Sequence, residues 1–144
     1  NELLQTVLED VCRAGPFDRA LFAFVDPEHN LLAGRIGFGR TVEALSRAFK
    51  FPLSSRGGPI AVSVLKKHDV FHCGTGKGAD WPTFQQTLGS RHFVLCPIEF
   101  DNTIHGCLFC DRENTKNLSE GTQQLIAQYR NTAAAAMKKS QAKL

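Results

Sequence analysis

The sequence lacks the features that mark membrane, secreted and nucleic-acid-binding proteins. No stretch approaches the ~20 consecutive apolar residues that a membrane-spanning helix needs, and no secretory signal opens the chain. Lysine and arginine are scattered, with local clusters only at residues 66–67 and 138–143, so no basic stripe interleaved with aromatic residues points to DNA or RNA. We therefore expect no membrane partner and no nucleic-acid partner, and a cytoplasmic location.

A convincing catalytic set is also missing. We find no paired carboxylates, no Ser-His-Asp set and no cluster of metal-ligating residue types at a known spacing. The sequence therefore predicts a protein that is not an enzyme, with no catalytic residue and no metal site, and it identifies no cofactor.

The five cysteines predict packing rather than chemistry. They are odd in number and scattered through apolar segments, which fits buried thiols in a reducing compartment better than a disulfide framework. Cys107 and Cys110 have the CxxC spacing of redox and zinc sites, but they fall within a predicted strand. Residues three apart in a strand point to opposite faces and lie ~10 Å apart, which excludes a disulfide. No second CxxC completes a zinc site.

The 144 residues suit a single domain, which we place at residues 1–144. Because the chain starts at Asn1 inside a predicted helix, we expect it to be a piece of a longer protein. Both the odd-numbered and the even-numbered positions of residues 93–98 are apolar, and these positions face opposite sides of a strand. The sheet should therefore be covered on both faces. The pattern predicts an α+β fold around one antiparallel sheet, with helices at 3–12, 41–49, 59–67, 81–88 and from 119 onward, and strands at 19–26, 31–38, 69–73, 92–100 and 104–111.

Two short motifs are interpreted as local structure. His68-Asp69 reproduces the dipeptide of HD-type phosphohydrolases, but no further histidines and aspartates complete a metal shell, so we expect a solvated helix end. Residues 74–78 (GTGKG) fail the phosphate-loop signature, because Phe71 stands where a glycine is required and Gly78 where Ser or Thr is required. They predict a mobile loop able to cover a pocket.

A hollow between the sheet and the middle helices is the predicted ligand site. Its expected lining residues come from the second strand, the middle segments and the loop: Phe38, Phe51, Phe71, Cys73, Trp81 and Phe84. Ordinary core packing of these residues is the alternative. Catalysis by Cys73 is disfavoured, because His72 is its neighbour in a strand and the two side chains would point to opposite faces.

Three strings resemble those of a GAF domain: residues 21–26 (LFAFVD), 92–98 (HFVLCPI) and 104–112 (IHGCLFCDR). Residues 37–53 look like GAF domains found beside HD-related output domains in bacterial signalling proteins. The resemblance covers almost the whole chain. It implies a GAF/PAS-like sheet of five or six strands, with both terminal helices on one face and short helices or loops on the other. The cyclic-nucleotide-binding pattern of the family is absent, and the bilin-binding order Cys-His is reversed here.

The leading hypothesis is therefore a non-enzymatic sensory or regulatory module of a bacterial signalling protein. It would bind an unknown small molecule or a partner, form a homodimer through its terminal helices, and relay the change to an attached output domain. Two alternatives stay open. One is a thiol-dependent reductase of the GAF-type methionine sulfoxide reductase class, using Cys73 with Cys96 as resolving thiol. The other is a purely structural dimerisation module.

Overall fold

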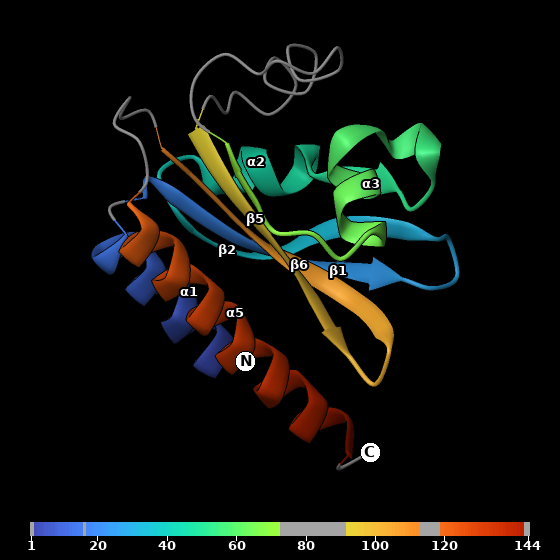
Figure 1. Cartoon of the computed structure of the whole chain (residues 1–144). Coiled ribbons are helices and arrows are strands. Elements are labelled where there is room, and N and C mark those ends of the chain that lie inside the picture. The colour runs from blue at the N-terminus through green and yellow to red at the C-terminus, as the bar shows by residue number, and fades with distance from the viewer. Residues whose placement is uncertain (1, 16, 73–91, 113–118, 143–144) are drawn as a thin grey trace.

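A curled sheet of six antiparallel strands forms the centre of the computed structural model (Figure 1). The structure describes residues 2–15, 17–72, 92–112 and 119–142. The order across the sheet is β3-β2-β1-β6-β5-β4. The strands are β1 (Arg19–Asp26), β2 (Leu31–Gly39), β3 (Lys50–Pro52), β4 (Val70–His72), β5 (His92–Phe100) and β6 (Thr103–Arg112). The predicted α+β class with a central antiparallel sheet is confirmed.

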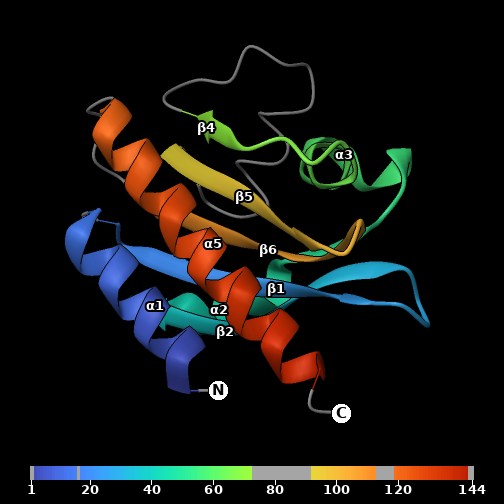
Figure 2. The same cartoon turned by 60° about the horizontal axis from the view of Figure 1, so that its bottom comes forward.

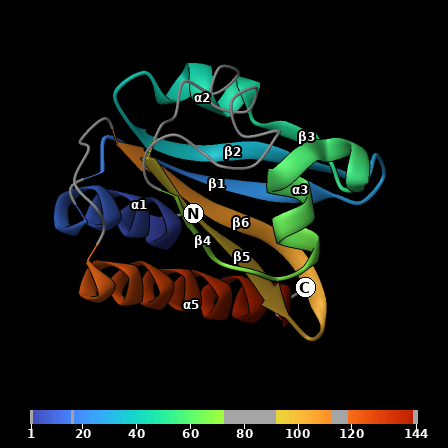
Figure 3. The ribbon, with the colours of Figure 1, turned by 45° about the horizontal axis from the view of Figure 1, so that its top comes forward.

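Helices cover both faces of this sheet. The helices are α1 (Glu2–Ala14), α2 (Val42–Ala48), α3 (Gly58–Leu65) and α5 (Glu120–Ala142), and a short 3-10 turn spans Ser55–Gly57. The two terminal helices lie side by side on one face (Figure 2), and α2 and α3 lie on the other (Figure 3), as expected from the sequence. Among the described helices, none combines the length and the apolarity needed to cross a bilayer.

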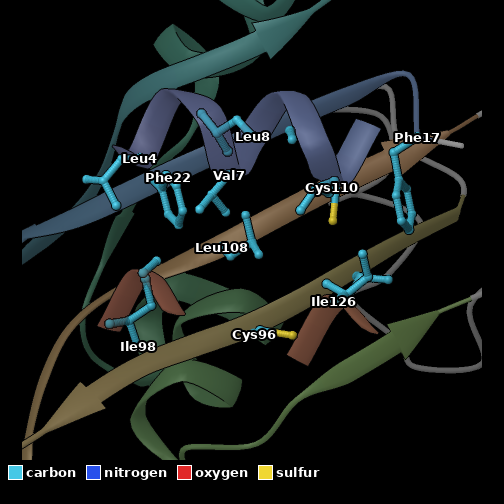
Figure 4. Packing of buried hydrophobic residues seen from close by; sticks show 14 residues of the cluster. Leu4, Val7, Leu8, Phe17, Phe22, Cys96, Ile98, Leu108, Cys110 and Ile126 are labelled. Carbon is cyan, nitrogen blue, oxygen red and sulfur yellow. The ribbon is translucent and has the colours of Figure 1, made fainter. Parts of the chain in front are cut away.

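The face under the terminal helices holds what we call the helix-pair core (Figure 4). The apolar stripe of α1 follows the helical period, with Leu4, Val7, Leu8 and Val11 buried. Helix α5 contributes side chains such as Ile126, and small Ala133 is buried in the same core. Ser119 caps the N-terminus of α5, because its hydroxyl accepts the Thr122 backbone N–H at 3.1 Å.

The other face holds an aromatic-rich core under α2 and α3, which we call the opposite core. The Phe109 ring lies between those of Phe49 and Phe93, with centroids 5.2 and 5.6 Å away. Burying aromatic rings of this size is worth roughly 2–3 kcal/mol each. The expected alternation is confirmed: Phe93 and Leu95 lie in the opposite core, and the residues that alternate with them lie in the helix-pair core, namely Val94, Cys96 and Ile98.

Backbone geometry explains the strand ends and one irregularity. Asp101 and Asn102 both have positive φ values, 54° and 60°, as the two-residue turn between β5 and β6 requires. The glycine-rich strand β2 contains a bulge. Phe22 pairs with Ile36 and Ala23 with Gly34, which leaves Arg35 as the extra residue.

The sequence pattern missed one strand and two predicted segments are not described. Strand β3 has only three residues, one of them Pro52, and it lies at the sheet edge beside β2. A segment this short shows no periodicity, so its pairing with β2 is what makes it a strand. The predicted loop at 74–78 and helix at 81–88 lie outside the described residues.

Candidate functional site

Three residues of the predicted ligand hollow lie on described strands of the sheet. Phe71 of β4 is paired with Val94 and packs against the helix-pair core. Phe51 of β3 packs against the opposite core, with its ring 5.0 Å from that of Phe49. Phe38 of β2 lies opposite Ala20 of the helix-pair core, and it is 37% exposed.

The sheet therefore separates Phe51 from the other two aromatic residues. The structure does not bring the three into one hollow, because strand parity sends Phe51 to one face and Phe38 and Phe71 to the other. Cys73, Trp81 and Phe84 lie outside the described residues, so a ligand-binding role for them stays a prediction.

The described thiols are packed rather than poised for reaction. Cys96, Cys107 and Cys110 have no exposed surface. Burial raises the pKa of Cys96 to about 12, and it raises the pKa of Cys107 and Cys110 as well. Cys12 is partly buried and its pKa rises to about 11. At neutral pH all four are thiols, whereas the nucleophile in thiol chemistry is the thiolate.

The CxxC pair behaves as the strand pattern predicts. Cys107 belongs to the opposite core and Cys110 to the helix-pair core, so the sheet stands between their sulfur atoms. Cys96 also lies in the helix-pair core, beneath α5. A resolving role for Cys96 would therefore require opening of that core.

A cluster of potential metal ligands lies in the turn after β1. Asp26, Glu28 and His29 offer ligand atoms that lie within 4.8 Å of one another. The Asp26 carboxylate already accepts the Glu28 backbone N–H at 3.1 Å and lies 2.8 Å from Nδ1 of His29. The hydrogen bond from His29 is the main cause that lowers the pKa of Asp26. The cluster stabilises the turn, and it is solvent-facing.

The clearest long-range polar contact ties α5 to the β4 side of the sheet. Arg130 Nη1 donates to Asp69 Oδ1 at 2.7 Å and to the Pro97 carbonyl at 2.9 Å, and Nη2 donates to Asp69 Oδ2 at 3.2 Å. The two charged side chains are only 19% and 27% exposed. We call these contacts the α5 clamp.

The α5 clamp joins three elements through one guanidinium. Arg130 lies in the middle of α5, Pro97 lies in β5, and Asp69 immediately precedes the edge strand β4. The planar guanidinium matches the two carboxylate oxygens, which gives the contact a fixed direction as well as energy. The contact therefore links the segment just before β4 to both β5 and α5.

The structure adds a long-range partner to the predicted helix end at His68-Asp69. Both residues are exposed, as a solvated helix end requires. Asp69 also binds Arg130, 61 residues further along the chain. No local spacing signals such a pair, because only the fold brings the two segments together.

Comparison with known proteins gives the family context for this arrangement. A family model described as a GAF domain matches residues 1–138. A search of the curated proteins finds no match.

Solved structures with the same fold come from proteins with different tasks. A methyl-accepting chemotaxis protein (residues 122 to 287) is 19% identical with a TM-score of 0.79, covering 96% of this chain and 88% of that one. A GAF domain/HD domain protein from Geobacter sulfurreducens is 15% identical with a TM-score of 0.75, covering 97% and 93%. The free methionine-R-sulfoxide reductase from Neisseria meningitidis is 16% identical with a TM-score of 0.77, covering 98% and 79%. At these identities the likeness shows the fold alone.

Proposed function

This chain belongs to the GAF domain family, and on that premise we propose that it is a non-enzymatic sensory module which relays a bound state through its terminal helices. GAF domains are sensory and regulatory modules of signalling proteins. The signal would be a small molecule or a protein partner. The receiver would be an output domain attached in a longer bacterial protein, and the HD-related class is the candidate that the sequence resemblance favours.

The observation that carries this proposal is the α5 clamp. A relay needs an element that ligand-dependent changes can reach and that also leads out of the domain. Asp69 immediately precedes β4, and Arg130 lies in the C-terminal helix α5. Because two hydrogen bonds join the Asp69 carboxylate to the Arg130 guanidinium, a shift of Asp69 and of the adjacent strand β4 would favour a shift of α5.

The packing of the terminal helices supports the same reading. Helices α1 and α5 contact each other and share one apolar core on the sheet (Figure 2). Small side chains such as Ala133 lie in that core, and their limited bulk lets elements approach closely. A helix pair resting on a sheet can shift as a unit, which is a known form of switching element.

The buried thiols support the non-enzymatic part of the proposal. All four described cysteines have raised pKa values because of burial, and the proposed resolving residue Cys96 is sealed beneath α5. A reductase that used one of these four cysteines as its nucleophile would instead need an accessible thiolate. Cys73, the nucleophile of the reductase alternative, lies outside the described residues.

Hydrogen exchange tests the relay. In Arg130→Gln the clamp loses its charge, so amide exchange should accelerate both in α5 around Arg130 and in the β4 residues Val70 and Phe71. Lys138→Gln is the matched control, because it removes an exposed pair with Asp101 on the same helix. A change confined to one of the two elements would contradict a mechanical link between them.

A second measurement tests sensing itself. Native mass spectrometry of the purified chain should reveal a co-purifying small molecule, or a metabolite panel should include one compound that changes exchange in α5. If no compound co-purifies and exchange in α5 stays constant across the panel, the small-molecule version of the proposal fails.

The terminal helices are also the proposed homodimer surface. Leu3 of α1 is 44% exposed, an apolar side chain on the outer side of the helix pair. Leu3→Glu should shift the molecular mass measured by light scattering from dimer toward monomer. A wild-type chain that is monomeric at the highest soluble concentration would remove this part of the proposal.

A further inference from the structure

Helix α2 lies beside β2, on the side of the sheet far from β4 (Figure 3). A small hollow lies between these two elements. Its volume is about 310 Å³, at the lower end of the range in which small-molecule sites are found. The residues that line it combine two guanidinium groups with one carboxylate and one hydroxyl: Arg35, Gly37, Val42, Glu43, Ser46 and Arg47.

Two glycines of β2 bring α2 close enough to form this hollow. A Cβ atom on Gly37 would lie 2.5 Å from Cγ2 of Val42, and one on Gly34 would lie 2.7 Å from the Ser46 carbonyl oxygen. Either contact is too short for real atoms, so any larger residue would push the helix outward. The glycines therefore set the position of Ser46 and Arg47 beside the strand.

The bulge in β2 supplies the second guanidinium. Arg35 is the extra residue between the pairs that Ile36 and Gly34 form with β1. Bulges redirect a side chain out of the regular alternation of a strand, and they are frequent beside functional sites. Here the redirected residue faces the same hollow as Arg47, which comes from a separate element.

The two guanidinium groups that line the hollow form no ion pair with another described residue. Among the described residues, Arg35 and Arg47 form no ion pair or side-chain hydrogen bond, although Glu43 lines the same hollow one helical turn before Arg47. Guanidinium groups present a planar fork of N–H donors that matches phosphate and carboxylate oxygens. Two of them from two elements can hold a tetrahedral dianion from both sides, and the Ser46 hydroxyl adds a further donor.

We propose that the hollow between β2 and α2 is a binding site for a phosphate-class oxyanion, held by Arg35 and Arg47. The anion is either inorganic phosphate or the phosphate group of a small metabolite. Glu43 weakens the site by repulsion and thereby limits it to ligands that supply two negative charges or a hydroxyl group able to donate to its carboxylate. This site is independent of the α5 clamp, which lies at the opposite edge of the sheet.

Titration of the chain with inorganic phosphate, followed by NMR at constant ionic strength set with chloride, tests the site. We expect saturable shifts of the backbone amides of residues 35–37 and 43–47. Arg35→Gln and Arg47→Gln should each weaken binding about tenfold or more, since each removes a charge-assisted contact. Glu43→Gln should tighten binding a few-fold, because it removes the repelling carboxylate.

Arg13→Gln is the control, because Arg13 is an exposed arginine on α1, across the sheet from α2. An unchanged affinity in this variant supports the site, and an equal loss would show that general positive charge is responsible and would overturn it. Shifts that do not saturate, or a wild-type affinity in both Arg35→Gln and Arg47→Gln, would also overturn it. Titration with glucose 6-phosphate separates the sources: tighter binding than inorganic phosphate indicates a phosphorylated metabolite, and equal binding indicates phosphate alone.

Discussion

Arg19 of β1 and Asp111 of β6 face each other across two neighbouring strands and form a two-point ion pair. Arg19 Nε donates to Asp111 Oδ1 at 3.0 Å, and Nη2 donates to Oδ2. The Asp111 side chain is 3% exposed and that of Arg19 is 14% exposed. The pair closes the end of the sheet where β1 begins and β6 ends, close to both terminal helices.

Removing one partner of this pair should destabilise the fold clearly. Asp111→Asn removes the carboxylate charge that binds the Arg19 guanidinium in a site that water barely reaches, so we expect a loss of about 2–4 kcal/mol in the free energy of unfolding. Urea denaturation measures the change. Asp101→Asn is the control, because its pair with Lys138 is more than half exposed and should change stability by less than about 0.5 kcal/mol. Similar losses in both variants would contradict the importance of burial.

Gly106 and Gly121 should respond oppositely to alanine. A Cβ on Gly106 would lie 2.1 Å from the Ala23 carbonyl oxygen in the neighbouring strand, so Gly106→Ala should cost about 3 kcal/mol. At Gly121, in the first turn of α5, the nearest atom would be Ser119 Oγ at 3.9 Å. Gly121→Ala should therefore stabilise the protein by up to about 1 kcal/mol, because alanine favours the helix. Thermal denaturation of the two variants checks both signs.

The described thiols should be slow to react in the native protein. Alkylation at pH 7.5 followed by mass mapping should label Cys12 slowly, and it should leave Cys96, Cys107 and Cys110 unlabelled until the protein unfolds. The same experiment measures how fast Cys73 is alkylated. Rapid labelling of Cys73 at low pH would favour the reductase alternative, and sluggish labelling of all five thiols would favour the sensory module.

Alkaline pH should destabilise the fold through the buried thiols. The pKa of Cys96 is raised from 9.0 to about 12 in the folded protein. Because this thiol ionises at a lower pH in the unfolded chain than in the folded protein, ionisation favours the unfolded state. The stability that the neutral thiol contributes is fully present below pH 9, and it is lost as the pH rises from about 9 toward 12. Each deeply buried thiol should therefore reduce the unfolding free energy by about 1.4 kcal/mol at pH 10.

Denaturation from pH 8 to 10.5 measures this effect. Cys96→Ala should flatten the decline, because one ionising group is removed from the unfolded state. Cys12→Ala serves for comparison: its raised pKa gives the same sign, but this thiol is only partly buried and its removal should leave the core intact. A decline of equal slope in the wild type and in Cys96→Ala would contradict the assignment.

The cores were largely predictable because strand parity is a local property. The alternation at residues 93–98 predicted two covered faces, and the structure places Phe93 and Val94 in different cores. The same parity predicted that Cys107 and Cys110 would be separated by the sheet. Strand parity also divides the residues of the predicted ligand hollow, because Phe51 lies across the sheet from Phe71.

The sequence by itself determined most of the elements, the two covered faces and the burial of the described strand thiols, since these follow from periodicities of 2 and 3.6 residues and from turn and cap residues such as Ser119 and Asn102. Strand β3 was the exception, because three residues show no periodicity. Only the tertiary structure decided which charges meet. Asp69 and Arg130 are 61 residues apart, and Arg19 and Asp111 are 92 apart. Arg35 and Arg47 line one hollow because of a bulge in β2 and two close glycine contacts. Contacts of this kind depend on strand order and on helix placement, which short-range patterns do not encode.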